Sequence, residues 1–434
     1  MIKLSKAVES IPHSPTLWAN DLVWDKRSKG ETVYHMGFGE APFPVPDHLQ
    51  EALSNAADRC EYIKAAGLPD LIETVREYHR PLLGDYVDQC NIIVAPGSKL
   101  ILYALQVAIE GDLLMPVPSW VSYEPQARLI GTDVIKVRTT LDDDGYHISA
   151  EDLTDAITKA RSEGKNPTKI ILNYPNNPTG LSIPEDELPA IAEVCEKEGI
   201  LIISDEIYGE VRFDTDSKYL SIAPHAPANT AVTTGLSKRL SLGGWRLGVG
   251  FIPKSIDGLQ DALCRFISET WSCVSAPVQA ASIEGYKHNP KSEQYAKDVA
   301  AIHCLMNQYI SQGLKDLGIE CPMAQGAFYN YPNFEPFKQE LANHGIHTSQ
   351  QLHEHLLTEY NLATLPGVSF GEEPEVLTLR LSGVDYDGTV ALNAYQSGEK
   401  LDHDFIAKYA PRIIKQIEIF AEFTHKVKDM KKAS

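Results

Sequence analysis

The chain has 434 residues, 43% of them hydrophobic and 23% charged, so it is longer than one hydrophobic core usually serves and we expect two or three domains. Its formal net charge of -20 argues against nucleic acid and anionic membranes as partners, because both select basic surfaces. Seven cysteines without C-x-x-C pairs or clustered Cys/His spacing argue against a disulfide framework and a metal site, which favours a reducing, cytoplasmic location.

The N-terminal segment, MIKLSKAVESIPHSP, contains no apolar stretch of the kind found in a secretory signal. No run of about eighteen uninterrupted apolar residues occurs in the sequence, although a membrane-spanning helix needs roughly that length. We therefore expect no membrane partner.

Short β-rich runs alternate with helical patterns from about residue 91 to residue 252. Such alternation is typical of an α/β fold, with a mostly parallel sheet covered by helices on both faces. The expected strands are NIIVA (91–95), DLLMP (112–116), DVIKV (133–137), KIILN (169–173), ILIIS (200–204), TAVTT (230–234) and RLGVGFI (246–252).

One helix in this region carries signals at both ends. Pro184 is expected to open it, residues 185–187 place acidic side chains in its first turn, and Gly199 follows its end. Its apolar residues recur on one face, which predicts an amphipathic helix packed on the sheet. These residues are Leu188, Ile191, Ala192 and Cys195.

Beyond about residue 290 the pattern changes to long helical stretches with short strands such as GAFYNYP and VLTLRLS, which predicts a smaller α+β domain. Because no Pro/Gly/Ser-rich linker separates autonomous domains, we expect the domains to be interleaved in sequence. Residues 51–288 are assigned to a large domain and residues 289–434 to the small one. Residues 1–50 are expected to contribute to the small domain.

The segment GLSKRLSLGGWRLGVG, residues 235–250, carries the most chemistry. Lys238 follows an apolar strand, beside Ser237 and before a Gly-Gly turn and Arg246. A lysine at a strand end is usually a solvated surface residue. A hydroxyl, a permissive turn and an arginine around one lysine favour another interpretation: an amine that forms an imine beside a phosphate, whose oxygens the hydroxyl and the guanidinium bind.

Two further positions predict a ligand at the carboxyl edge of the sheet. Gly97, Ser98 and Lys99 open the apolar helix SKLILYALQVAI, where backbone N–H groups form an anion site; a helix-capping Ser98 is compatible with this. Asp205 follows the strand ILIIS at the edge where open α/β sheets bind ligands. Asp205 could instead cap a helix or lie at the surface.

The run S-K followed by G-W-R-L-G resembles the lysine signature of the class I/II aminotransferases, the fold-type I pyridoxal-phosphate family of aspartate aminotransferase. Other family motifs follow in the family's order over most of the chain. The resemblance implies a fold-type I transferase with a cofactor-binding large domain and a small α+β domain built from both chain ends. The matching segments are EYIKAAGLPDL (61–71), GSK (97–99), PSW (118–120), NYPNNPTG (173–180), SDEIYGEV (204–211), GAFY (326–329), PGVSFG (366–371) and LRLS (379–382).

The resemblance implies a role for each residue around the cofactor ring. Lys238 holds pyridoxal 5'-phosphate as a Schiff base and serves as the base in proton transfer. Asp205 binds the pyridine nitrogen and keeps it protonated. Asn177 and Tyr208 bind the phenolic oxygen, although Asn177 could be a turn former and Tyr208 a core residue. Trp120 stacks over the ring or, equally, belongs to the core.

At the phosphate, the resemblance implies that residues 97–99, Ser237 and Arg246 form a cup. Tyr62 in EYIKAAG resembles a tyrosine that reaches the phosphate of the neighbouring subunit. The resemblance therefore implies a homodimer whose active sites are shared.

For the substrate, the resemblance implies that Arg380 binds the α-carboxylate with its planar fork, with Gly39 and Asn177 beside that carboxylate. Without the resemblance, Arg380 could lie on an exposed strand face and Gly39 in a simple turn. The implied reaction moves an amino group between an α-amino acid and a 2-oxo acid by a ping-pong mechanism. A lyase, a cyclopropane-forming synthase or an oxidase on the same scaffold, and a non-catalytic regulatory protein, remain alternatives.

The sequence departs from the family pattern in three ways. Arg239 follows the lysine where a smaller or apolar residue is expected, and residues 383–404 are interpreted as an insertion. No segment matches the second arginine that dicarboxylate-specific members use for the side-chain carboxylate. Aspartate as substrate is therefore unsupported by the motifs, and an aromatic, branched or unusual amino acid is equally possible.

Overall fold

The computed structural model describes residues 3–9, 11, 15–142, 145–214 and 218–429. A seven-stranded sheet forms one part of the molecule, with strand order β2-β10-β9-β8-β7-β3-β4. The pairings between β10 and its two neighbours are antiparallel, and the other pairings are parallel, so the expected mostly parallel sheet is confirmed. Its strands coincide with the seven expected runs: β2 (Cys90–Ala95), β3 (Asp112–Val117), β4 (Val134–Arg138), β7 (Pro167–Asn173), β8 (Leu201–Asp205), β9 (Thr230–Thr234) and β10 (Gly248–Pro253).

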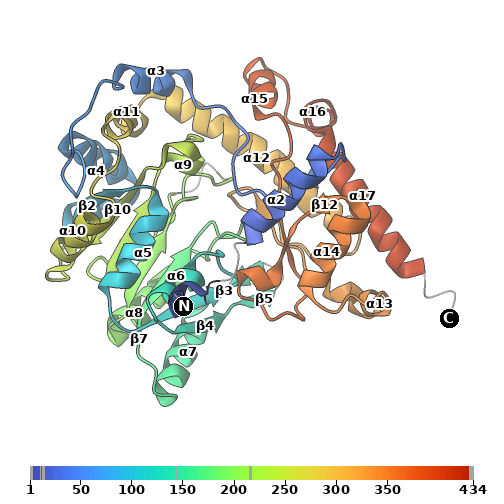
Figure 1. The fold of residues 1–434 in the computed structure, drawn as a ribbon, viewed down its shortest axis with the longest axis horizontal. Helices are drawn as coiled ribbons and strands as arrows, with labels where there is room; N and C mark the ends of the chain where they lie inside the picture. Colours follow the sequence, from blue (N-terminus) through green and yellow to red (C-terminus); the bar gives the residue numbers. More distant parts are fainter. Residues whose placement is uncertain (1–2, 10, 12–14, 143–144, 215–217, 430–434) are drawn as a thin grey trace.

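Helices cover both faces of this sheet (Figure 1), and successive strand residues pack on opposite sides. Ile202 belongs to the apolar cluster beneath one set of helices, whereas Ile203 belongs to the cluster beneath the other. Two-sided burial explains why these strands are continuous apolar runs rather than alternating ones. One face carries α5 (Ser98–Ala108), α6 (Tyr123–Leu129) and α10 (Leu259–Thr270), and the other α4 (Pro69–Leu83), α7 (Ala150–Ser162), α8 (Glu187–Glu198) and α11 (Ala276–Tyr286).

Helix α8 is the helix expected between the fourth and fifth strands. Its four apolar residues are buried, and Gly199 ends it in the left-handed conformation with φ 68°. The expected start at Pro184 is wrong, because the helix begins at Glu187 and Asp186 is its N-cap. The Pro184 carbonyl accepts a hydrogen bond from Glu187 N at 3.1 Å, so residues 184–186 form a turn ahead of the helix.

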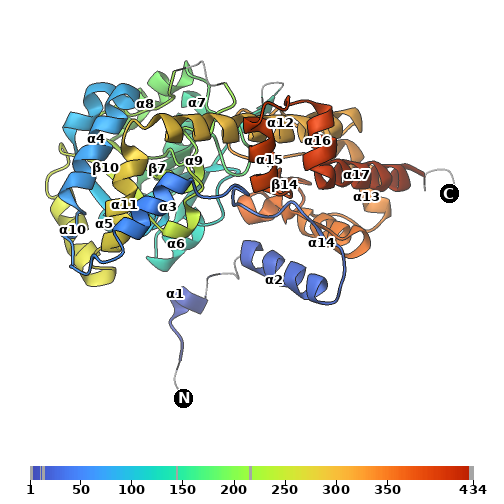
Figure 2. The same cartoon turned by 90° about the horizontal axis from the view of Figure 1, so that it is seen from above.

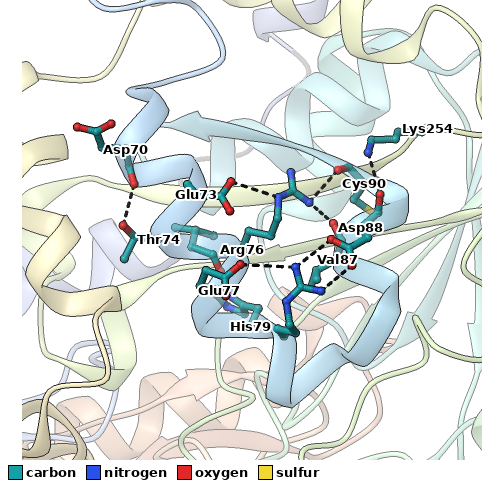
Figure 3. Close-up of polar contacts among 12 residues, drawn as sticks. Asp70, Glu73, Thr74, Arg76, Glu77, His79, Val87, Asp88, Cys90 and Lys254 are labelled. Atoms are coloured by element: carbon teal, nitrogen blue, oxygen red, sulfur yellow. Dashed lines mark hydrogen bonds and ion pairs between the residues drawn. The ribbon is translucent and has the colours of Figure 1, made fainter.

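Polar contacts fix α4 to the start of β2 (Figure 3). Arg76 Nη1 donates to the carbonyls of Val87 and Cys90, across the short helix η1 (Gly84–Gln89). Lys254 Nζ, beyond the end of β10, donates to the Asp88 carbonyl at 2.8 Å. These contacts hold α4 against the edge of the sheet.

The C-terminal part is built on the long helix α12 (Pro290–Asp316), which runs from the side of α11 toward the last helices in both ribbon views (Figures 1 and 2). The C-terminal part also contains an antiparallel three-stranded sheet of β11 (Tyr329–Asn330), β14 (Leu379–Ser382) and β13 (Leu365–Pro366). The helices around it are α13 (Lys338–Asn343), α14 (Ser349–Tyr360), α15 (Gly388–Gln396), α16 (His403–Tyr409) and α17 (Pro411–Asp429).

The N-terminal segment contacts both parts of the molecule. Strand β1 (Tyr34–His35) pairs in parallel with β12 (Leu362–Ala363), whereas α3 (Asp47–Asn55) packs against α11. The division of the chain at residues 50/51 and 288/289 stays a prediction. The remaining elements are α1 (Lys6–Glu9), α2 (Pro15–Ser28), β5 (Thr140–Asp142), β6 (Gly145–His147), α9 (Leu236–Arg239), and the short helices η2 (Gly243–Trp245), η3 (Glu335–Phe337) and η4 (Gly367–Phe370).

Residues 383–404 are folded into the C-terminal part, where α15 packs against α12. The side chain of Asp385 accepts hydrogen bonds from His35 N at 2.9 Å, Arg412 Nη2 at 2.9 Å and Gln416 Nε2 at 3.0 Å, which ties β1 to α17. The interpretation of this segment as an insertion stays a prediction. Among the helices in the described ranges, none is both long enough and apolar enough to cross a membrane.

Candidate active site

A cavity of about 1340 Å³ lies over the carboxyl edge of the seven-stranded sheet. Strands β7 and β8 end there at Asn173 and Asp205, and the residues that follow β2 and β9 also reach it. The three-stranded sheet contributes Tyr329 and Arg380 to the same cavity. Every predicted site residue lines it except Tyr62, so the fold brings together residues from position 39 to position 380.

Asp205 is buried at the end of β8, with 3% of its surface exposed. Its Oδ2 accepts a hydrogen bond from Tyr123 OH at 2.7 Å, and its Oδ1 accepts one from Thr233 Oγ1 at 3.2 Å. Burial raises the pKa of Asp205 to about 6, while these donors oppose the rise. The carboxylate is therefore still mostly ionised at neutral pH. Its burial excludes a surface carboxylate, and a helix cap is excluded because the described residues directly after β8 form turns and not a helix.

Lys238 lies on α9, a single helical turn directly after β9. Its Nζ donates to the Gly39 carbonyl at 2.6 Å and lies near the rings of Tyr208 and Phe328. Burial lowers the pKa of Lys238 to about 8, so a substantial fraction of the amine is neutral near physiological pH. A neutral amine is a nucleophile and a base, whereas an ammonium is neither.

The turn between β2 and α5 forms an anion cradle. Gly97 has φ 91°, a backbone conformation that favours glycine, and a Cβ there would meet the end of the Arg246 side chain. Ser98 begins α5, so the first turn of α5 borders the cavity, and Ser237 lines the same cavity. The Arg246 guanidinium donates to the carbonyls of Gly243 and Pro96, and it has no acidic ion-pair partner in the described ranges. Its positive charge is thus available to an anion.

Lys99 and Trp120 lie together at the rim. Lys99 Nζ is 4.9 Å from the centroid of the Trp120 ring, and that ring meets Tyr123 edge-to-face at 5.3 Å. Burial and the nearby Arg246 both lower the pKa of Lys99. Trp120 is partly exposed to the cavity, so it is not solely a core residue.

Arg380 is 2% exposed in β14, which excludes an exposed strand face. Its Nη2 donates to the Gly37 carbonyl at 2.6 Å and its Nη1 to Asn177 Oδ1 at 3.1 Å, while the guanidinium packs over the Tyr329 ring at 4.6 Å. Its Nε has no hydrogen-bond partner and no acidic side chain pairs with it among the described residues. A buried cation without a counter-ion is costly, so the geometry favours binding of an anion here.

The hydroxyl of Tyr329 lies in the cavity between Tyr208 and Asn177, and the sequence predicted no role for this residue. Its hydroxyl lies 2.8 Å from Tyr208 OH and accepts from Asn177 Nδ2 at 3.5 Å. A Cβ on Gly39 would lie 2.9 Å from the same hydroxyl, so Gly39 is a close-approach glycine rather than a simple turn residue. Asn176, in contrast, accepts from Thr179 within its own turn. The signal for Tyr329 was the GAFY motif, whereas Tyr123 and Thr233 lie outside every matched motif.

The family model described as aminotransferase class I and II matches residues 31–385. The chain belongs to this family. The aspartate aminotransferase of Geobacillus stearothermophilus is 33% identical, over 86% of this chain and 93% of the relative. An asparagine–oxo-acid transaminase of Streptococcus mutans is 30% identical, over 87% and 94%. The structure of an aspartate aminotransferase from Thermus thermophilus with maleate superposes with a TM-score of 0.81 and 25% identity, covering 97% of this chain and 100% of that one.

This aminotransferase is therefore a pyridoxal-phosphate-dependent enzyme of fold type I that acts on amino acid and oxo acid substrates. Its own cavity fits that cofactor. Lys238 supplies an amine of lowered pKa, Asp205 an ionised carboxylate, and the turn at Gly97 with Arg246 a cradle for a phosphate. The three groups lie at one sheet edge, as the binding of an aldehyde, a pyridine nitrogen and a phosphate on one molecule requires.

Tyr62 is the predicted site residue that lies elsewhere. It is 93% exposed and does not line the cavity of its own chain. Its expected role at the phosphate of a neighbouring subunit stays a prediction.

Proposed function

We propose that this aminotransferase carries out ping-pong transfer of an amino group from an α-amino acid to a 2-oxo acid, with Lys238 as the catalytic residue. The observation that carries the proposal is the buried Arg380 guanidinium, which shares a cavity with Lys238 and has no acidic partner among the described residues. It supports an α-carboxylate as the group recognised, because the planar fork binds two carboxylate oxygens in parallel.

The residues of the cavity would divide the work as follows. Bound pyridoxal phosphate supplies an electron sink that stabilises negative charge at the substrate α-carbon. Lys238 would anchor the cofactor through its amine and would serve as the base that removes and returns the substrate α-proton. Asp205 would hold a proton on the pyridine nitrogen. The hydroxyl of Tyr208 and the amide of Asn177 would donate to the phenolic oxygen, while Arg380 would orient the carboxylate.

We leave the amino donor open between two groups of candidates. The relatives quoted above include aspartate and asparagine transaminases, which makes these amino acids the first to assay. Of the lining cations outside the expected cofactor and carboxylate sites, Arg128 pairs with Glu124 and Lys136 lies 3.7 Å from Glu373. Because both cations already have acidic partners, neither is free to bind a second carboxylate of a substrate. Aromatic and branched amino acids therefore belong in the same assay panel.

The test is a titration of the purified enzyme with single amino acids, followed by its visible spectrum. A donor should convert the absorbance of the bound cofactor to that of the aminated form, and a 2-oxo acid should restore it. Double-reciprocal plots should be parallel. Elimination products, hydrogen peroxide or a ring-closed product, in place of the 2-oxo acid, would instead indicate a lyase, an oxidase or a synthase.

We also propose that the enzyme is a homodimer in which Tyr62 reaches the partner's phosphate cradle, and that it is cytoplasmic. The support for the dimer is the exposure of a large aromatic residue outside its own cavity. Light scattering should give twice the chain mass, and Tyr62→Phe should weaken cofactor retention. A fully active monomer would remove Tyr62 from the site.

A further inference from the structure

Arg239, next to Lys238, is buried on the side of α9 that faces away from the cavity. It is 6% exposed and does not line the cavity, whereas Lys238 does. The two neighbouring side chains therefore leave one helical turn in different directions. A turn of four residues has little stability of its own, so tertiary contacts must fix its orientation.

Three elements meet at the Arg239 guanidinium. Its Nε forms an ion pair with Glu210 Oε2, and its Nη1 donates to the Gly285 carbonyl of α11 at 3.3 Å. The guanidinium carbon lies 4.9 Å from the centroid of the Tyr78 ring on α4. Tyr78 OH donates to the same carboxylate of Glu210, at 2.8 and 2.7 Å from its two oxygens. The charge of Glu210 is thus shared between one cation and one hydroxyl.

Glu210 belongs to the short segment that directly follows Asp205, the last residue of β8, and this segment carries the cavity residue Tyr208. Within this segment Gly209 N donates to the Glu206 carbonyl and Val211 N to the Tyr208 carbonyl, so it is a series of tight turns. The Val211 carbonyl in turn accepts from Ala327 N at 2.7 Å, two residues before Tyr329. Glu210 therefore lies two residues from Tyr208, and a backbone hydrogen bond connects the next residue, Val211, to the segment that carries Tyr329.

We propose that Arg239, through its ion pair with Glu210, is a positioning residue that fixes Lys238 relative to Asp205 and Tyr208. The inference rests on the proposed catalytic role of Lys238. The ion pair joins the turn that carries the amine to the turns that carry the ring-binding groups. Since a misplacement of about 1 Å can slow a proton transfer roughly a hundred-fold, a contact that sets this distance affects turnover.

Burial is the largest cause of the lowered pKa of Lys238, followed by the charges of Glu40, Arg380, Arg246 and Asp205. The role proposed for Arg239 is geometric, because its contacts with Glu210, Gly285 and Tyr78 fix the orientation of α9. The position also explains one departure from the family pattern: the arginine stands where a smaller residue is expected because its side chain fills the space between α4 and α11.

The test is a double-mutant cycle on the holoenzyme with Arg239→Met and Glu210→Gln. Each single variant should lower kcat about ten-fold, with the KM of both substrates within about two-fold, because Arg380 is untouched. The double variant should be no slower than the slower single variant, since both remove one contact. Wild-type kcat in folded single variants, or effects that multiply in the double variant, would overturn the proposal.

Hydrogen exchange of the full-length chain supplies a readout that does not depend on turnover. Amides of residues 206–211 and 236–242 should exchange about ten-fold faster in Arg239→Met, while the rest of the chain is unchanged. If Arg239→Met fails to fold, Arg239→Lys keeps the charge and loses the fork, and the same local change is expected. Unchanged local exchange in a folded variant contradicts the proposal.

The matched control is Arg161→Met, which breaks an exposed ion pair between Arg161 and Glu198, joining α7 to the end of α8. It should leave kcat and the exchange of both segments unchanged, and a loss equal to that of Arg239→Met would mean that any lost ion pair has this effect. Failure of the proposed function gives a different result. Activity in Lys238→Ala would remove the catalytic role of Lys238, whereas faster local exchange in Arg239→Met would still show that the ion pair fixes these segments.

Discussion

The cavity has a cofactor half around Asp205 and Lys238, where we propose that pyridoxal phosphate binds, and a carboxylate half around Arg380, where we propose that the substrate carboxylate binds. Burial has different consequences for the ionisable groups of these two halves. In the cofactor half, burial raises the pKa of Asp205 to about 6 and lowers that of Lys238 to about 8, so the two pKa values approach neutral pH from opposite sides. In the carboxylate half, burial also lowers the pKa of Arg380, yet a guanidinium remains charged at any physiological pH. Asp205 and Lys238 can therefore exchange protons near neutral pH, which suits them to proton transfer. Arg380 keeps its charge, which suits it to binding an anion.

The halves are also assembled differently. Asp205, at the end of β8, is held by Tyr123 of α6 and Thr233 of the neighbouring strand β9, which lie 82 and 28 residues away in the sequence. Arg380 is held by the Gly37 carbonyl and by Asn177, which lie 343 and 203 residues away in the sequence. Substitutions in the cofactor half should therefore change rates and pH dependence, and those in the carboxylate half should change substrate selection.

The largest expected effect is that of Lys238→Ala. The variant should fold and bind cofactor non-covalently, but kcat should fall by about ten-thousand-fold, because the proton-transfer base is lost. Steady-state turnover measures this, with the melting temperature as the control for folding. Retention of wild-type kcat would end the assignment of chemistry to this half.

Arg380→Lys should lower kcat/KM about ten- to a hundred-fold, because it keeps the charge and loses one charge-assisted hydrogen bond. Amino and 2-oxo acids should be affected alike, whereas simple amines should be nearly indifferent and the cofactor spectrum unchanged. Kinetics with a matched acid and amine pair decide this. Equal impairment of both, or release of cofactor, would place Arg380 in the cofactor half.

Asp205→Asn should stabilise the cofactor-free chain at pH 8 by about 3 kcal/mol, because a folded-state pKa raised above the unfolded one penalises the ionised form. The penalty is complete above pH 6 and vanishes as the pH falls toward 4, so the two chains should converge there. Urea unfolding across this range measures it. Arg380→Met should show no such slope, and a slope in both variants would remove the contrast between the halves.

The smallest expected effect is that of Tyr329→Phe, which removes the hydroxyl between Tyr208 and Asn177. A neutral hydrogen bond contributes about 1 kcal/mol, so kcat/KM should fall about five-fold. Steady-state kinetics should show the loss for amino and 2-oxo acids together. No change would mean that the two halves work independently.

The sequence predicted the seven strands because burial on both faces leaves a continuous apolar run. It misplaced the start of α8, since Pro184 and the acids after it form a turn that has the composition of a first helical turn. Tyr123 and Thr233 were not predicted, because a tyrosine or threonine near a strand looks like a core residue until its tertiary partner is known. Arg380 was assigned by resemblance, and its burial could not be inferred from a four-residue strand.

The pairing of β1 with β12, described above for the N-terminal segment, sets the timing of assembly during synthesis. His35 N donates to Asp385, 350 residues further along the chain, and Gly37 follows at once with the carbonyl that holds Arg380. A nascent chain emerging from the ribosome can complete its central sheet long before these partners exist. The part of the cavity around Arg380 is therefore the last to form, and a chain that has emerged only as far as the central sheet contains Lys238 and Asp205 but still lacks Arg380.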